Sequence, residues 1–492
     1  MKGLPTWPVA ALLGLTALRL LAAAVIPLAP DEAYYWVWSR APALGYFDHP
    51  PIVALWIWAG TGLLGDGPLG IRLLAPVSAA VGSVLLVQVA TDLFADRRAG
   101  IVAAMLLNAT LLFGIGAVTM TPDTPLLFFW TLTLWALARA AATGRGSWWL
   151  VAGIAAGLAM ASKYTAMFLA PGVLLWLLAA PSMRPWLRRW QPWAAAALTA
   201  LVFAPVLAWN AAHGWVSLAK QAGRVGVWAP GRALGYLAEL FGGQIGLVTP
   251  GVAVLCGAGL VLALRRAWAG QGAFVLLAAL TVPAVLMFVQ HALGDRVQAN
   301  WPSVLYPQLV LAAACLGAPW KRWQVPSAAL GFGLTALIWV QAAAAPLPLP
   351  MRLDPTLLRL GGWDRLAAEI EVVAAREHAV FVASDNYAHA ALLARLLPPR
   401  LAVLGAEERW ALFDLDLANA HARAAGRTGL LLRSARRDDR PDSANWAEIT
   451  PVATLNRARD GMVAEAFRLY RVVGQATNRV GYDTLVILPR PR

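Results

Sequence analysis

The stretch WPVAALLGLTALRLLAAAVIPLAPDEAYYWVWSR (Trp7–Arg40) decides the fold class, because an apolar run ends in it on two adjacent acids. The apolar part carries a single charge, Arg19, and is long enough to cross a hydrocarbon core of about 30 Å. Asp31 and Glu32 then begin a segment rich in Tyr and Trp. This pattern predicts a membrane-spanning helix that is retained in the protein and ends at a water-facing surface.

The composition extends this interpretation to most of the chain. Of the 492 residues, 59% are hydrophobic and only 13% are charged, so a polytopic membrane protein is expected. Cys256 and Cys315 fall inside apolar segments, where they resemble buried small hydrophobes more than a disulfide or a metal pair. We expect about eleven spans of the usual length. They are predicted near residues 8–28, 69–94, 100–118, 124–142, 148–162, 165–180, 193–211, 246–265, 272–290, 303–317 and 326–345.

The loops between these spans alternate in charge. Short basic loops all fall on one side, which the positive-inside rule assigns to the cytoplasm. These are Lys2, Asp96–Gly100, Arg139 with Arg145, Met183–Trp190, Leu264–Trp268 and Lys321–Trp323. The net charge of +14 is therefore partly topological and does not indicate a nucleic-acid partner.

The candidate catalytic and binding residues are predicted on the opposite, non-cytoplasmic side. Asp31, the Gly45–Pro51 loop and the Met120–Pro125 loop all fall there, and an odd number of spans sends the tail to the same side. The segment after Pro346 is predicted to form a soluble α/β domain with helices over Trp363–Arg376 and Ala388–Leu397. Its strand-like stretches are 379–383, 428–432, 467–473 and 484–488. We predict a transmembrane domain over 1–346 and an extracytoplasmic domain over 350–492.

Several motifs together carry a family resemblance. DEAYYWVWSR, GYFDHPP, TPDTPLLFFW, SKYTA, WNAAHGW and NWP occur in this order and loop context. Over roughly the first 310 residues the chain resembles the GT-C glycosyltransferases of the protein O-mannosyltransferase and lipid A aminoarabinose transferase superfamily. The resemblance implies an inner-membrane enzyme with its active site on the periplasmic face. It would move a sugar, with inversion, from a polyprenyl-phosphate donor to a lipid A, other glycan or protein acceptor among the membrane lipids.

The resemblance assigns the first-loop acid, Asp31, as the general base. A carboxylate beneath aromatic side chains is partly desolvated, which raises its proton affinity and suits this role. Glu32, Tyr34 and Tyr35 are expected to support it. The alternative is that Asp31 only caps a helix that begins at Glu32.

A second acid, Asp123, stands between prolines in TPDTP, and the family resemblance implies that it supports the base or holds the acceptor. It could also cap the fourth predicted span. Lys163, Arg224 and Arg296 are expected to stabilise the departing lipid phosphate. The alternatives are that Lys163 snorkels to the headgroups and that the arginines bind anionic lipid.

The FDHPP motif raises the question of a metal. The resemblance places Asp48 and His49 near the donor phosphate or sugar, with His213 in support. The same three residues are the candidate ligands if a divalent ion is used, although the histidine spacing has low specificity, and no other cofactor is assigned.

Two other functions fit parts of the pattern. A glycan ligase or polymerase would use the same carrier with a longer sugar chain. A polyprenyl-sugar transporter would also have many spans, but it should show inverted repeats and ionisable residues near the midplane.

Overall fold

The computed structural model describes residues 6–222, 228–413, 415, 417–441, 443, 445–475 and 485–491. Its internal contacts divide the chain into two compact units. The helical unit comprises Met1–Leu21, Asp48–Val53 and Arg72–Leu337, and the sheet unit comprises Ala22–Phe47, Ala54–Ile71 and Ile338–Arg492. The sheet unit therefore combines the C-terminal residues with segments from the first loop. The domain boundary predicted between residues 346 and 350 stays a prediction.

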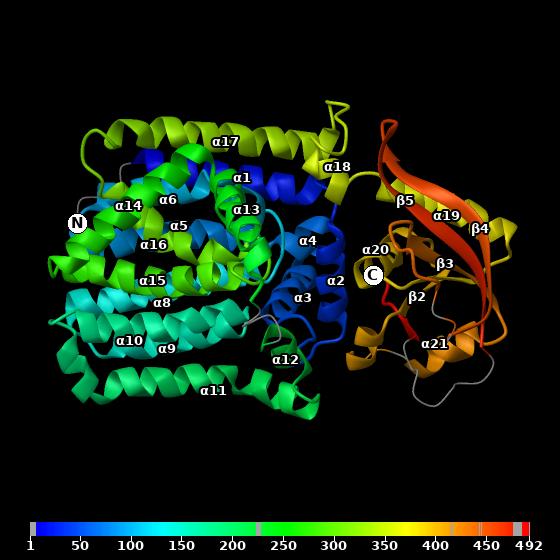
Figure 1. The fold of residues 1–492 in the computed structure, drawn as a ribbon, viewed down its shortest axis with the longest axis horizontal. Coiled ribbons are helices and arrows are strands. Elements are labelled where there is room, and N and C mark those ends of the chain that lie inside the picture. The colour runs from blue at the N-terminus through cyan, green and yellow to red at the C-terminus, as the bar shows by residue number, and fades with distance from the viewer. Residues whose placement is uncertain are drawn as a thin grey trace. The chain divides into compact units, whose positions relative to one another are not determined.

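Helices build the first unit, and α1 and α17 continue into the second. They are α1 (Thr6–Val25), α5 (Leu74–Phe94), α6 (Arg97–Asn108), α7 (Leu111–Gly116), α8 (Asp123–Thr143), α9 (Ser147–Met160), α10 (Leu169–Ala179), α11 (Trp190–Ala212), α12 (Val216–Ala222), α13 (Pro230–Val248), α14 (Pro250–Trp268), α15 (Gly272–Ala292), α16 (Tyr306–Ala314) and α17 (Lys321–Ala344). Short 3₁₀ turns are η1 (Tyr164–Phe168), η2 (Arg184–Arg188) and η3 (Trp301–Leu305). Figure 1 shows α9 running alongside both α8 and α11.

Within the described residues, seven helices are long and apolar enough to cross a membrane. The polytopic helical architecture is thus confirmed, while the total of about eleven spans stays a prediction. The continuous span expected over 100–118 is wrong, because α6 ends at Asn108 and α7 begins at Leu111. Thr110 causes the break, since its side chain accepts the Phe113 N–H at 3.1 Å and starts a new helix.

Small residues let these helices approach closely. A side chain on Gly153 of α9 would meet the Ala195 carbonyl of α11 at 2.4 Å, and Thr199 donates to the Gly153 carbonyl at 2.9 Å. A side chain on Gly259 of α14 would likewise meet the Ala313 backbone of α16, at 2.6 Å. Such contacts are typical of helices packed within a membrane, where small residues and hydroxyl hydrogen bonds replace the hydrophobic driving force.

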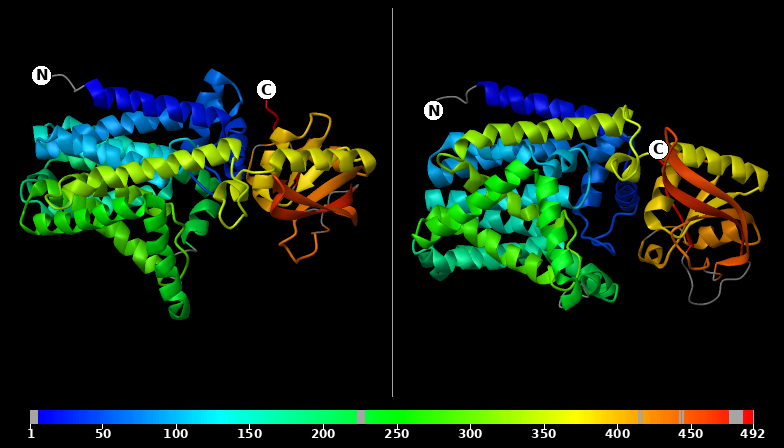
Figure 2. Two further views of the ribbon diagram at one scale, coloured as in Figure 1. Left: turned by 90° about the horizontal axis from the view of Figure 1, so that it is seen from above. Right: turned by 45° about the horizontal axis from the view of Figure 1, so that its top comes forward.

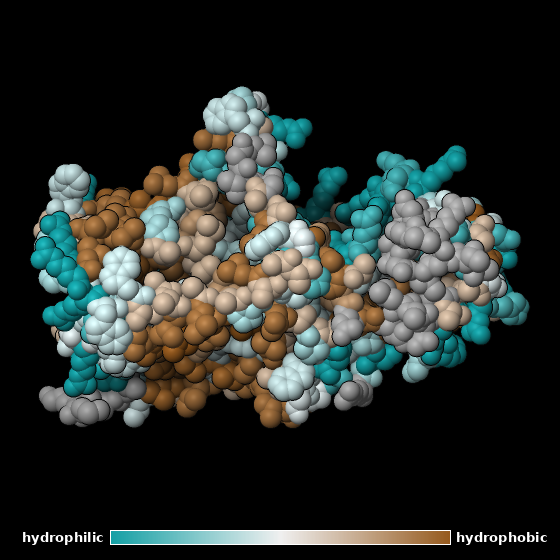
Figure 3. All heavy atoms as spheres, turned by 90° about the horizontal axis from the view of Figure 1, so that it is seen from below, coloured by the Kyte–Doolittle hydropathy of each residue, from teal (hydrophilic) through white to brown (hydrophobic). Residues whose placement is uncertain are grey.

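The outer surface of the helical unit fits the same environment. Large apolar side chains are exposed along α1, α5 and α11, among them Leu13, Val81 and Leu201. Figure 3 shows apolar residues covering the sides of the helices, with polar residues gathered at the end of the helical unit. The helices are therefore apolar toward the surroundings as well as toward one another, as expected of a bundle surrounded by lipid.

The sheet unit carries six strands in the order β4-β5-β3-β1-β2-β6. They are β1 (Phe381–Ser384), β2 (Ala402–Ala406), β3 (Thr428–Ser434), β4 (Trp446–Arg459), β5 (Met462–Gly474) and β6 (Leu485–Ile487). β1 pairs in parallel with β2 and β3, and the other pairings are antiparallel. The helices of this unit are α2 (Pro30–Arg40), α3 (Ile52–Leu64, shared with the helical unit), α4 (Pro68–Arg72), α18 (Pro355–Arg359), α19 (Trp363–Arg376), α20 (Tyr387–Leu396) and α21 (Leu417–Ala424), with a 3₁₀ turn η4 (Glu408–Leu412).

The predicted α/β tail is confirmed by this sheet. Figure 2 shows α19 packed on the strands, and its bounds match the predicted helix. Phe381 of β1 stacks on Trp446 of β4, with 5.9 Å between ring centroids. Residue 429 must be glycine here, because a side chain at Gly429 would meet the Phe381 ring at 2.1 Å.

Candidate active site

The site is built around Asp123, the first residue of α8. Pro122 precedes the helix and provides no side-chain cap. The Asp123 carboxylate instead bonds across the fold to Lys163 Nζ, at 2.7 and 2.8 Å from its two oxygens. The helix-cap alternative for Asp123 is therefore wrong, because the carboxylate is used to join separate segments of the chain.

Lys163 lies in extended backbone between α9 and η1. Only 6% of its side chain is exposed, and its ammonium group is paired with Asp123. Snorkelling to a headgroup region is thus excluded in this conformation. The pair is a buried ion pair, in which removal of one partner leaves an uncompensated charge.

Two further residues complete the cluster, and neither was predicted from the sequence. Asn300 Nδ2 donates to Asp123 at 2.6 Å, and Ser303 Oγ donates to its other oxygen at 3.3 Å. Asn300 is the first residue of the NWP motif, so the motif pointed to this loop without identifying the polar side chain. The Asp123 carboxylate accepts bonds from residues up to 180 positions away in the chain.

The FDHPP loop contributes a second ion pair. Asp48 pairs with Lys220 of α12, and Gln221 Nε2 donates to the Asp48 carbonyl at 3.3 Å. The structure therefore fixes the loop to α12 through both the side chain and the backbone of Asp48.

His49 links this second pair to the Asp123 cluster electrostatically. Burial and, to a smaller extent, the Lys163 charge lower the His49 pKa, the Asp48 and Asp123 carboxylates oppose the shift, and the resulting pKa is about 4. The imidazole is therefore neutral at pH 7 and suited to donate or accept a hydrogen bond. The structure brings Asp48, His49, Asp123 and Lys163 into one region of the helical unit.

No contact with the Asp123 cluster is established for three other candidate residues, Arg296, His213 and Arg224. Arg296 is exposed and pairs with Glu239 of α13 at 2.5 Å. His213 stacks on Trp209 at 4.1 Å, and its Nδ1 lies 2.7 Å from the Trp209 carbonyl. Arg224 lies outside the described residues.

The proposed metal ligands do not assemble. Within the part of the chain that the structure describes, no group of three or more His, Cys, Asp and Glu side chains is arranged to hold a metal ion. Asp48, His49 and His213 therefore do not form a ligand set in this conformation.

Asp31 and Glu32 begin α2 in the sheet unit. The helix starts at Pro30, and Glu32 Oε2 accepts the Ala29 N–H at 3.0 Å. Glu32 is 1% exposed, and its supporting role stays a prediction. The alternative in which Asp31 caps a helix beginning at Glu32 is wrong, since Glu32 makes the terminal contact and Asp31 is already helical.

The predicted supporting tyrosines are held by aromatic contacts. Tyr34 is 1% exposed, and its ring centroid lies 5.0 Å from that of Trp38. Tyr35 also packs edge-on against Trp38, at 5.0 Å. The aromatic segment after Asp31 is therefore largely buried within its own unit.

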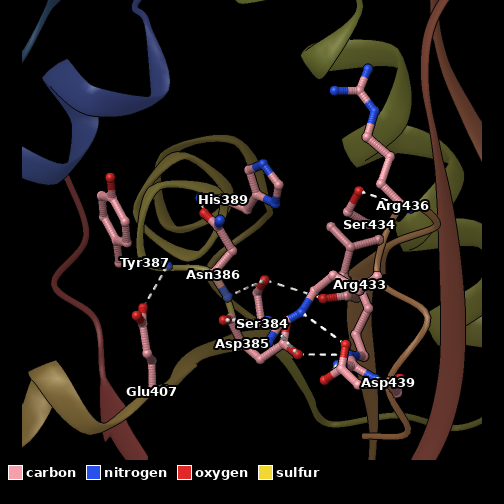
Figure 4. Close-up of polar contacts among 12 residues, drawn as sticks. Ser384, Asp385, Asn386, Tyr387, His389, Glu407, Arg433, Ser434, Arg436 and Asp439 are labelled. Atoms are coloured by element: carbon pink, nitrogen blue, oxygen red, sulfur yellow. Dashed lines mark hydrogen bonds and ion pairs between the residues drawn. The ribbon is translucent and has the colours of Figure 1, made fainter. Parts of the chain in front are cut away.

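A separate polar cluster lies at the carboxyl ends of β1 and β3 (Figure 4). Arg433 donates to Asp385 at 2.6 Å and to Asp439 at 2.8 Å. The hydrogen bond from Arg433 lowers the pKa of the Asp439 carboxyl. Arg433 is therefore paired with two carboxylates of its own unit, Asp385 and Asp439.

Comparisons with known proteins agree with this architecture. Residues 48–209 match the family model described as dolichyl-phosphate-mannose-protein mannosyltransferase. The chain is 29% identical over 72% of its length, and 75% of the relative's, to lipid A galacturonosyltransferase RgtD of Rhizobium johnstonii. It is 30% identical to the undecaprenyl phosphate-alpha-4-amino-4-deoxy-L-arabinose arabinosyl transferase of Pseudomonas aeruginosa, over 33% of this chain and 32% of that protein.

The fold has a solved counterpart along nearly its whole length. The apo crystal structure of ArnT from Cupriavidus metallidurans superposes with a TM-score of 0.62 at 14% identity, covering 95% of this chain and 98% of that one. The ArnT structure bound to undecaprenyl phosphate gives a TM-score of 0.60 at 13% identity, covering 95% and 97%. The chain therefore matches the mannosyltransferase family model over residues 48–209 and shares the ArnT fold along nearly its whole length, in agreement with the resemblance to GT-C glycosyltransferases.

Proposed function

We propose that the protein transfers one sugar from a polyprenyl-phosphate donor to lipid A on the periplasmic face of the inner membrane. The observation that carries the proposal is the buried Asp123–Lys163 pair, held by Asn300 and Ser303 beside His49. The similarity to a lipid A galacturonosyltransferase supports lipid A as the acceptor. The similarity to an undecaprenyl phosphate-dependent arabinosyl transferase, and to ArnT bound to undecaprenyl phosphate, supports the polyprenyl carrier.

The proposed reaction is an inverting displacement. Asp31 takes the proton from the acceptor hydroxyl or amine as that atom bonds to the anomeric carbon. The bond from this carbon to the phosphate oxygen breaks, and the phosphate leaves with the electron pair. Positive or hydrogen-bonding groups near the leaving oxygen stabilise the developing charge. Lys163, His49, Arg224 and Arg296 are assigned this role.

The cluster is suited to receive a phosphate without carrying excess charge beforehand. Lys163 is neutralised by Asp123, and Lys220 is neutralised by Asp48. An incoming phosphate would compete with these carboxylates for the ammonium groups. Asp48 and Asp123 thus hold the two lysines in place until the donor binds, because a buried lysine needs a partner.

Mass spectrometry of lipid A, core saccharide and surface glycans tests the acceptor assignment. Cells with the gene should carry lipid A that is heavier by one sugar unit than lipid A from cells without it. The purified protein should release polyprenyl phosphate only when the acceptor is present. A mass change in another glycan, with lipid A unchanged, would contradict the lipid A assignment while leaving glycosyl transfer in place.

The proposed topology has its own test. Single cysteines would be introduced at positions 31 and 400 and in the Arg184–Arg188 turn, in a background lacking Cys256 and Cys315. We expect a membrane-impermeant thiol reagent to label positions 31 and 400 from the periplasm and the turn only after permeabilisation. Labelling of position 31 or 400 only from the cytoplasmic side would contradict the periplasmic active site.

A further inference from the structure

The helix that carries Asp31 packs on residues from the C-terminal part of the chain. The Tyr34 ring lies 4.4 Å from that of Tyr387 and 5.6 Å from that of Trp410, measured between centroids. Tyr34 and Trp410 are 1% and 0% exposed. All these residues belong to the sheet unit. Tyr34 therefore packs in a core shared by α2, α20 and η4.

The first anchor of α2 is Arg409 in η4. Its guanidinium lies 3.7 Å from the Tyr387 ring centroid and 5.8 Å from that of Tyr34. Glu407 pairs with Arg409 at 2.9 Å and accepts the Tyr387 N–H at 3.2 Å. Figure 4 shows Tyr387 beside Glu407 and apart from the Arg433 cluster. Arg409 is thus held by Glu407 and Tyr387 while its guanidinium also faces the ring of Tyr34, three residues after Asp31.

The second anchor is Arg395 of α20. Its guanidinium lies 4.6 Å from the Trp36 ring centroid, and its Nη2 donates to the Asp66 carbonyl at 2.5 Å. Asp66 in turn accepts Trp36 Nε1 at 2.9 Å and pairs with Arg40 at 3.2 Å. Trp36 is therefore fixed on its face by Arg395 and at its edge by Asp66.

These anchors constrain the residues on which Asp31 depends. α2 has 11 residues, and a helix of this length is marginal without tertiary packing. Residues three and four apart are neighbours on a helix surface, so Tyr34 and Tyr35 adjoin Asp31. Fixing Tyr34 and Trp36 consequently fixes both the rotation of α2 and its position along its axis.

We propose that the C-terminal domain has a catalytic task, which is to position Asp31 through the Arg409 and Arg395 anchors on α2. This inference rests on the proposed function of Asp31 as the general base. Arg409 and Arg395 are positioning residues, because they contact the helix and not the reacting atoms. Their effect should appear in turnover and not in donor binding, since displacement of a catalytic group by about 1 Å can cost about a hundredfold in rate.

The test uses the purified full-length protein. Arg409→Ala and Arg395→Ala should each lower kcat about tenfold to a hundredfold, with polyprenyl phosphate binding nearly unchanged. Arg409→Lys, which keeps the cation over Tyr387, should recover part of the loss. Arg365→Ala is the matched control, because Arg365 lies on α19 of the same unit and forms an exposed pair with Glu369. It should keep normal turnover.

A double-variant comparison separates positioning from general stability. If Arg409 acts through Asp31, Asp31→Asn with Arg409→Ala should be no slower than Asp31→Asn alone. Multiplicative losses, or donor binding and kcat that fall together with thermal stability, would overturn the inference. Normal kcat in both arginine variants, with Asp31→Asn inactive, would overturn the inference and leave the proposed function intact. Normal turnover in Asp31→Asn would instead overturn the proposed base.

Discussion

Asp31→Asn should lower turnover by about 10²–10⁴-fold while leaving donor binding largely unchanged, as is usual when a general base is removed. The carboxamide keeps the shape of the side chain but cannot take the proton from the acceptor. The structure supports this expectation, because Glu32 accepts the Ala29 N–H at the start of α2. Loss of activity in Asp31→Asn would therefore not reflect loss of that contact. Single-turnover rates with purified donor and acceptor provide the measurement.

Glu32→Gln is the matched control for this variant. Its amide oxygen can still accept the Ala29 N–H, so the helix start is retained and turnover should fall much less than in Asp31→Asn. If Asp31→Asn kept near-normal turnover, the base would have to be Asp123 or the catalytic assignment would fail. A loss in Glu32→Gln as large as that in Asp31→Asn would argue that burial at the start of α2, and not proton transfer, limits the rate.

The sequence predicted elements with strong local signals well. α19 was located to the residue because its apolar positions recur with helical spacing. The span predicted over 124–142 lies within one residue of α8 at each end, because α8 begins after a proline turn and ends at Gly144 in the left-handed conformation. β4 was missed, since it is a half-exposed edge strand with Pro451 inside it and repeated register shifts. Propensity carries little information for such a strand.

The sequence predicted on which side of the membrane the site residues lie, but not which of them contact one another. Loop order placed Asp123 and Lys163 on the same face, yet nothing local in the sequence states that these residues, 40 positions apart, form an ion pair. Asn300 was missed for the same reason, because its role depends on where η3 meets the start of α8. The packing of α2 on α20 and η4 could not be predicted from local patterns either, since it joins the first loop to Tyr387 and Trp410.

The second large effect is expected at Lys163. Lys163→Ala should weaken donor binding and lower turnover by about 10²–10³-fold, the usual cost of removing one donor that stabilises developing negative charge. It should also destabilise the protein by about 3–5 kcal/mol, because Asp123 would remain as a buried carboxylate without its cation. The bonds from Asn300 and Ser303 to Asp123 should keep the helices folded. Donor titration and thermal unfolding in detergent measure the two effects separately.

A double variant that replaces both Lys163 and Asp123 by uncharged residues separates the effect on turnover from the effect on stability. Lys163→Met combined with Asp123→Asn removes both charges, so most of the lost stability should return while turnover stays low. Arg139→Gln is the control, since Arg139 forms a comparable pair with Asp92 toward the far end of α8, at 2.9 Å. This variant should lose stability but keep donor affinity. Recovery of turnover in the double variant, or unchanged kinetics in Lys163→Ala, would remove Lys163 from the phosphate site and leave the ion pair with a structural role alone.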